Sequence, residues 1–261
     1  MTIAKSAGTG TVGAVTDHND GTYTAVVTAP TLVGSGTFTA TVNSSTIGAV
    51  SVTYTPGAAD AARSALTPVT SSVTADGVST QTLTVQAKDV NGNALTTGGS
   101  TVTIAKTGGS GTIGAVTDNN DGTYTADVTA PVSVGSGTFV ATLGGSAVKG
   151  GGASQTQATV NYVTAAANAA HSTLTPTSGT RTANGTATIV LTVQARDVND
   201  NALASGGDTV TIGKVSGPGS ISGVTDHNDG TYTAIVTAPA TTGTAVFSAT
   251  LNGSPVKSGG A

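Results

Sequence analysis

Cysteine, glutamate and tryptophan are absent from this sequence, and each absence excludes a class of protein. Without cysteine, the chain can form neither a disulfide framework nor a zinc–thiolate site. Without glutamate, it lacks the bidentate carboxylate that calcium loops commonly use. Without tryptophan, and with only five tyrosines, it has few of the exposed aromatic platforms that a carbohydrate-binding module would need. The sequence therefore points away from metal-stapled and sugar-binding modules.

Charge is also scarce, at 8% of residues with a net charge of -4, against about 25% in an average protein. With so few charged residues and a negative net charge, the chain has no basic surface to bind nucleic acid or acidic membranes. No apolar run approaches the roughly 20 residues of a membrane span, and nothing after Met1 resembles a signal peptide. Because 37% of residues are hydrophobic, the composition does not fit a disordered chain. We expect a folded protein with no nucleic-acid partner and no membrane insertion.

Threonine supplies about a fifth of the residues, and serine, asparagine and glycine are also abundant. Uncharged hydrogen-bonding groups do not depend on salt screening, so such a surface suits a medium that the cell does not control. This composition favours an extracellular or cell-surface location.

One segment of nine residues occurs three times, and it reveals a repeat. Between the second and third copies the register stays at 108 residues without a gap, from Leu66 on Leu174 to Val148 on Val256. A fixed period of this length indicates an array of one folding unit. The copies of the segment are Asp17–Ala25, Asp118–Ala126 and Asp226–Ala234.

Alternation of apolar and polar residues dominates each unit and predicts half-buried antiparallel strands. In Thr82–Lys88, for example, Leu83, Val85 and Ala87 face one way. Six or seven such strands in about 100 residues are typical of an immunoglobulin-like β-sandwich. We predict an all-β fold of tandem sandwiches arranged end to end, because the linker Thr164–Asn168 is short. The expected strands of the middle unit are Ser64–Thr70, Ser79–Lys88, Ser100–Lys106, Gly111–Thr117, Thr123–Ala130, Gly137–Leu143 and Gln155–Val163.

The alignment of the copies divides the chain into three units of unequal completeness. Residues 1–56 form an incomplete unit that lacks its opening strands, residues 57–164 form a complete unit, and residues 165–261 form a unit that lacks its final strand. Two interpretations follow. Either the chain is a piece of a longer repeat protein, or its open units are completed by strands of another copy.

The residues resemble a known family. Asn184–Thr186 leading into Ile189–Leu203 resembles the opening half of bacterial Ig-like repeats of the invasin/intimin type. Thr209–Ile212, Val224–Asp226 and Gly230–Tyr232 are similar to the closing half of those repeats, which filamin repeats share more distantly. The resemblance covers nearly the whole chain and implies Ig-like sandwiches in a secreted or surface-tethered bacterial adhesin. The family's membrane anchor and receptor-binding module have no counterpart here, so the resemblance assigns adhesion to no residue.

The segment Asp197–Asn201 matches the Asp-x-Asn-Asp-Asn string with which cadherins bind calcium between domains. It lies between two strands of one unit, however, and the middle unit has Asp89–Asn93 there, with one carboxylate fewer. We therefore predict turns at both places, in which Asp and Asn bond their own backbone.

Two further motifs resemble functional sites, but we interpret both as structural. His18 and His227 lie in the repeated turn, but the middle copy has Asn119 there, so imidazole is not required. The string GxGxxG at Gly8–Gly13 and Gly109–Gly114 precedes a predicted strand rather than the helix that a dinucleotide site needs. We expect no catalytic, cofactor-binding or metal-binding residue.

Catalysis has no support, because His171 has no paired nucleophile and the aspartates lie in turns. We expect no enzyme and no cofactor, but a structural stalk or spacer that mediates adhesion by presenting distal modules. The alternative is a self-assembling extracellular filament or lattice subunit joined by strand complementation. The expected partners are other copies of the repeat or chain, and a host or surface ligand bound through modules outside this chain.

Overall fold

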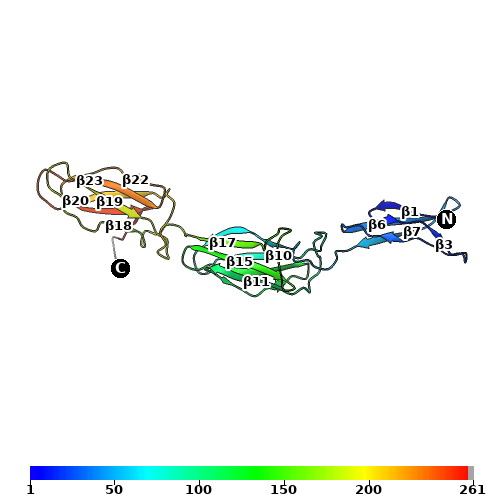
Figure 1. Cartoon of the computed structure of the whole chain (residues 1–261). Coiled ribbons are helices and arrows are strands. Elements are labelled where there is room, and N and C mark those ends of the chain that lie inside the picture. The colour runs from blue at the N-terminus through cyan, green and yellow to red at the C-terminus, as the bar shows by residue number, and fades with distance from the viewer. Residues whose placement is uncertain (258–261) are drawn as a thin grey trace.

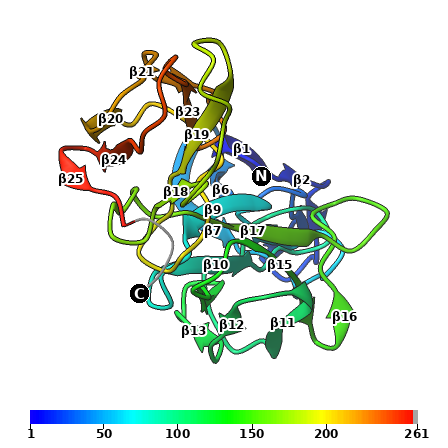
Figure 2. The same ribbon diagram turned by 90° about the vertical axis from the view of Figure 1, so that its left-hand side faces the viewer.

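The computed structural model describes residues 1–257, and within them every regular element is a β-strand. The strands form three groups, β1–β7, β8–β17 and β18–β25, which we call the first, second and third units. Figure 1 shows the units following one another along one direction. Seen from one end in Figure 2, the units overlap in part, and the third unit lies to one side of the second. The prediction of an all-β array of Ig-like sandwiches is confirmed.

The second unit is a complete sandwich of two sheets. One sheet has the order β12-β14-β10-β8 with β13 on β14, and the other has the order β11-β15-β17-β9 with β16 on β15. All neighbours are antiparallel except β17 and β9, which run parallel. This arrangement is the immunoglobulin layout. The strands are β8 (Ala65–Thr67), β9 (Thr70–Thr74), β10 (Thr80–Gln86), β11 (Val102–Gly109), β12 (Thr112–Ile113), β13 (Thr117–Asp118), β14 (Thr123–Thr129), β15 (Gly135–Leu143), β16 (Ser146–Ala147) and β17 (Gln157–Val163).

The core of this unit is made by alternate residues of facing strands. Leu83 and Val85 of β10 are fully buried beside Tyr124 and Val128 of β14, and Phe139 covers them from the other sheet. The Tyr124 ring fills the end of the core, and its hydroxyl accepts a hydrogen bond from the backbone N–H of Ser100 at 2.9 Å. A tyrosine suits this place because its ring is apolar while its hydroxyl needs a partner.

Two expected strands differ from the structure. The segment Ser64–Thr70 is divided, because Pro68 has no N–H to donate to a ladder. Its first part, β8, pairs with β10, and its continuation β9 crosses to the other sheet and pairs with β17. The segment Gly111–Thr117 forms only the short strands β12 and β13, which both pair with β14.

The first unit has no counterparts of β8, β9 and β10. Its strand equivalent to β14 is therefore broken into β4 and β5, since the neighbour that would hold it is missing. Tyr23, the counterpart of Tyr124, is 40% exposed, compared with 1% for Tyr124. The strands are β1 (Thr2–Gly8), β2 (Thr11–Val12), β3 (Thr16–Asp17), β4 (Tyr23–Thr24), β5 (Val27–Thr28), β6 (Gly34–Val42) and β7 (Ser45–Tyr54).

The third unit has no counterpart of β17 among its described residues. The residues equivalent to β9, Ser178–Thr182, form no strand, because β9 pairs only with β17. Phe247 is half-buried, whereas its counterpart Phe139 is fully buried. The strands are β18 (Thr173–Thr175), β19 (Thr188–Gln194), β20 (Val210–Ser216), β21 (Ser220–Ile221), β22 (Thr225–Asp226), β23 (Thr231–Thr237), β24 (Val246–Leu251) and β25 (Ser254–Pro255).

We predict that residues 57–164 fold cooperatively when expressed alone and that residues 1–56 do not. The second unit closes two sheets over one core, whereas the first unit leaves strand edges and apolar side chains without cover. Circular dichroism during heating measures this directly. A sharp thermal transition of the isolated 1–56 segment would show that it does not need its missing strands.

Candidate functional site: the joints between units

The segments Asp89–Asn93 and Asp197–Asn201 form the turns that the sequence predicts. In each, the aspartate N–H donates to the backbone oxygen of the final asparagine at 2.9 Å. The fourth residue has a positive φ, 86° at Gly92 and 65° at Asp200. Glycine adopts this conformation without steric cost and aspartate tolerates it, so both residues are accommodated in the same turn.

These turns also make a contact between units, which the sequence analysis did not predict. The Asn93 side chain reaches the preceding unit, where its Nδ2 donates to the backbone oxygen of Thr31 at 2.8 Å. The backbone N–H of Val33 donates to its Oδ1 at 3.2 Å. The amide group of Asn93 thus pairs with residues i and i+2 of a loop, much as a peptide group does with a neighbouring strand.

The second joint repeats the first. Asn201 Nδ2 donates to the backbone oxygen of Val132 at 2.8 Å, and the N–H of Val134 donates to Asn201 Oδ1 at 3.3 Å. Val132 and Val134 occupy the same loop positions in the second unit as Thr31 and Val33 do in the first. The same contact therefore holds both joints of the described chain.

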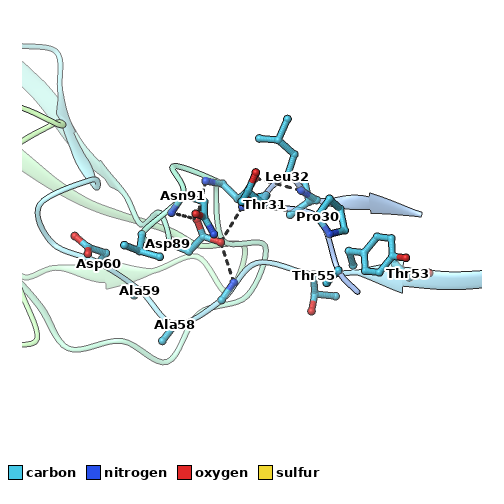
Figure 3. A pocket seen from close by; sticks show the side chains of 16 residues that line it. Pro30, Thr31, Leu32, Thr53, Thr55, Ala58, Ala59, Asp60, Asp89 and Asn91 are labelled. Atoms are coloured by element: carbon cyan, nitrogen blue, oxygen red, sulfur yellow. Dashed lines mark hydrogen bonds between the residues drawn. The ribbon is translucent and has the colours of Figure 1, made fainter. Parts of the chain in front are cut away.

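The aspartate of each turn holds the linker. The backbone N–H of Gly57 donates to Asp89 Oδ2 at 2.9 Å, and that of Ala165 donates to Asp197 Oδ2 at 3.1 Å. The close-up of the first joint in Figure 3 shows Asp89 between the linker and the loop of the preceding unit. Asp89 and Asp197 are 2% and 0% exposed. Buried carboxylates need partners of this kind.

Hydrogen bonds keep both aspartates ionised. The Asn93 side chain, followed by the N–H of Gly57, lowers the pKa of Asp89 from 3.8 to about 2. At Asp197 burial raises the pKa, but hydrogen bonds from the Asn201 side chain and the N–H of Ala165 outweigh it, and the net pKa is lowered. In both turns the charged form is the one that the surroundings bind.

A cavity of about 670 Å³ lies beside the first joint. Pro30, Leu32, Tyr54 and Val90 give it an apolar wall, and Asp89 lies at one side (Figure 3). Its only carboxylates are those of Asp60 and Asp89. The cavity separates two units and carries no set of groups suited to catalysis.

The other motifs make local contacts. His18 and His227 each approach a threonine hydroxyl of the strand that follows the turn, at 2.9 and 2.8 Å. His171 Nδ1 lies 2.8 Å from the Asp200 carboxylate on the exposed side of the second joint. A strand, not a helix, follows each GxGxxG string.

Among residues 1–257, no three His, Cys, Asp or Glu residues gather as a metal site would require. Within the same residues, no helix is long and apolar enough to cross a membrane.

The sequence did not reveal the joint, because the segments Asp89–Asn93 and Asp197–Asn201 were interpreted only as turns within their own units. One signal could have found it. In an Ig-like sandwich the loop after the second strand lies at the same end as the unit's N-terminus. The turn at Asp89–Asn93 therefore had to face the linker at Gly57.

We predict that the carboxylate of Asp89 stabilises the chain in a pH-dependent way. Its folded pKa, about 2, lies below the ordinary 3.8, so its contribution is complete above about pH 4 and is lost as the pH falls toward 2. The unfolding temperature of the Asp89→Asn variant should lie below that of the parent at pH 6. The gap should close between about pH 4 and 2.

Asp127→Asn, at an exposed aspartate of β14, is the matched control. A gap between the parent and Asp89→Asn that stays constant down to pH 2 would mean that the charge of Asp89 does not stabilise the fold.

Solved structures of other bacterial proteins resemble the array. The structure of invasin, described as a bacterial integrin-binding protein, is 27% identical with a TM-score of 0.58, over 89% of this chain and 46% of that one. The structure of FdeC, described as an Escherichia coli adhesin, shares the fold with 22% identity and a TM-score of 0.62, over 98% of this chain and 84% of that one. The chain thus spans about half the length of the invasin structure.

A family model described as invasin, domain 3, matches three successive segments, residues 1–57, 60–165 and 168–259. Together they include nearly every residue of the sequence. Modules of this adhesin type are binding or structural elements and not enzymes. The chain belongs to the invasin domain 3 family.

Proposed function

We propose that the chain is a stalk or spacer segment of a bacterial adhesin that is secreted or held at the cell surface. Its units, which we divide as residues 1–56, 57–164 and 165–261, would carry distal modules away from the cell. The observation that supports this function is the end-to-end array with the same contact at both joints (Figure 1).

The surface of the units fits this role. Charged side chains are few, at 8% of the residues, and uncharged hydroxyl and amide groups take their place. A spacer needs to stay extended and inert, and uncharged polar groups are insensitive to ionic strength. The likeness to invasin and FdeC supports a place in an adhesin. The ligand would then be bound by modules outside this chain.

We predict that the chain adds reach but no adhesion of its own. It is inserted between an outer-membrane anchor and a peptide tag on bacteria, and a second version lacks residues 57–164. Access of a bulky antibody to the tag should fall when the unit is removed. Bacteria that display the chain without a tag should adhere to host cells no better than bacteria with the anchor alone. Adhesion by the chain alone would make it a binding head and not a spacer.

A second candidate function is self-assembly by strand complementation. A groove of about 360 Å³ runs along the third unit where β17 lies in the second unit. Leu174, Ile189, Leu191 and Phe247 line it. In the second unit, Ala158, Val160 and Tyr162 of β17 are buried against the strand equivalent to β24. A strand of the same pattern from another copy would fit the groove.

For this candidate we predict that a peptide of residues 154–163 binds the chain and raises the unfolding temperature of its third unit. The same peptide with Val160→Asp is the control, because a charge at that position would be buried without a partner. Calorimetry measures the binding, and light scattering shows whether the peptide suppresses association of the chain. A chain that stays monomeric and does not bind the peptide would exclude strand donation.

A further inference from the structure

We propose that each Asp-x-Asn-x-Asn turn is a clasp that fixes the angle between successive units, and that it works without a bound cation. The proposal deepens the stalk function proposed above, on which it rests, by naming the residues that keep the stalk extended. The clasp consists of the first and last residues of the turn, Asp89 with Asn93 at the first joint and Asp197 with Asn201 at the second.

The clasp restrains each joint because it attaches at two places. The aspartate holds the N–H of the linker, and the asparagine holds a loop of the preceding unit. The linker alone would allow the units to bend and turn about it. A second attachment away from the linker removes most of these motions, since bending must now break the bonds of Asn93 to Thr31 and Val33.

Each clasp is rigid within itself. The final asparagine also donates its Nδ2 to the carboxylate of the same turn, at 2.9 Å in both joints. This bond fixes the direction of the amide group before it meets the loop. Asn93 is 9% exposed, so the bonds that it makes are largely shielded from competing water.

The carboxylate of each turn already accepts a hydrogen bond at each of its acceptor sites, so it does not need a cation. Asp89 Oδ1 accepts from the N–H groups of Asn91 and Asn93, and Oδ2 accepts from Gly57 N and Asn93 Nδ2, all at 2.9 Å. Asp197 accepts the equivalent four bonds. An ionised carboxylate offers about four acceptor sites. A calcium ion there would have to displace N–H donors, whose positive ends repel it.

The partner of the clasp is backbone. Thr31–Val33 in the first unit and Val132–Val134 in the second have different sequences, yet they present the same carbonyl and N–H to the asparagine. The clasp therefore recognises the shape of this loop, and any unit of the fold that forms the loop can be held.

The two joints differ in one way that makes a matched control. Asn199 Nδ2 donates to the backbone oxygen of Ala75 at 3.1 Å, which adds a further bond across the second joint. Ala75 follows β9, and the first unit has no counterpart of that strand. The side chain of Asn91, the equivalent of Asn199, makes no hydrogen bond among residues 1–257. Asn91→Ala should therefore leave the first joint unchanged.

The test measures the distance between neighbouring units in the whole chain. Because the sequence has no cysteine, spin labels can be attached at Ala49→Cys and Ala105→Cys across the first joint, and at Ala105→Cys and Val215→Cys across the second. All three positions are exposed on strands. Double electron–electron resonance then gives the distribution of distances for each joint.

We expect a narrow distribution in the parent. Loss of the two loop bonds in Asn93→Ala or Asn201→Ala should raise the population of bent conformations by about tenfold. Asn91→Ala should match the parent, and Asn199→Ala should broaden the second joint less than Asn201→Ala does. Millimolar calcium or EDTA should change none of these distributions. Circular dichroism confirms that each variant keeps its folded units.

Two results would overturn the proposal. One is a distribution for Asn93→Ala and Asn201→Ala that is as narrow as that of the parent. The other is a parent distribution that narrows with calcium or broadens with EDTA. Either result leaves the stalk function standing, because reach on the cell surface is measured separately. Conversely, adhesion by the displayed chain alone would remove the stalk function and leave the clasp intact.

Discussion

Burial of alternate side chains between two sheets is the constraint on which each unit depends. In a strand of the second unit such as β10, every second residue faces the core, and the opposite sheet must be present to cover it. The three units show this dependence at different stages of completion. Where neighbouring strands are absent, the strand that contains Tyr23 breaks into short pieces, and where the final strand is absent, Phe247 remains half-buried. The same sequence pattern thus forms a continuous, buried strand only where the neighbouring strands are present.

The joints depend on a different interaction, the saturation of a buried carboxylate by N–H groups. A chain without cysteine cannot fasten its units by disulfides. It uses instead an aspartate and an asparagine that are already needed to form a turn. The backbone of the turn supplies two of the four N–H donors to the carboxylate. The linker and the asparagine side chain supply the other two. Folding of the unit and orientation of its neighbour therefore share residues.

The sequence was sufficient to predict the elements that local patterns determine. Period-two alternation located β10, β14 and β15 closely, and the repeated nine-residue segment supplied the Asp-Gly turn between β13 and β14. Two features depend on distant partners and were not predicted. The segment after Pro68 changes sheets because it pairs with β17, some 90 residues later in the chain. The Asn161 side chain of β17, for example, donates a hydrogen bond to the backbone oxygen of Ser71. The role of Asn93 in the joint depends on a loop of another unit, 62 residues earlier in the chain. Neither partner is visible in the local pattern.

The use of backbone groups at the joint has a consequence for how such arrays evolve. A joint between side chains would need matched residues wherever two units of different sequence are brought together. Here the loops Thr31–Val33 and Val132–Val134 share no residue but the last, yet each is held in the same way. Duplication or deletion of a whole unit by recombination would leave every remaining joint functional. The length of such an array can therefore change in whole-unit steps, without any interface having to be rebuilt.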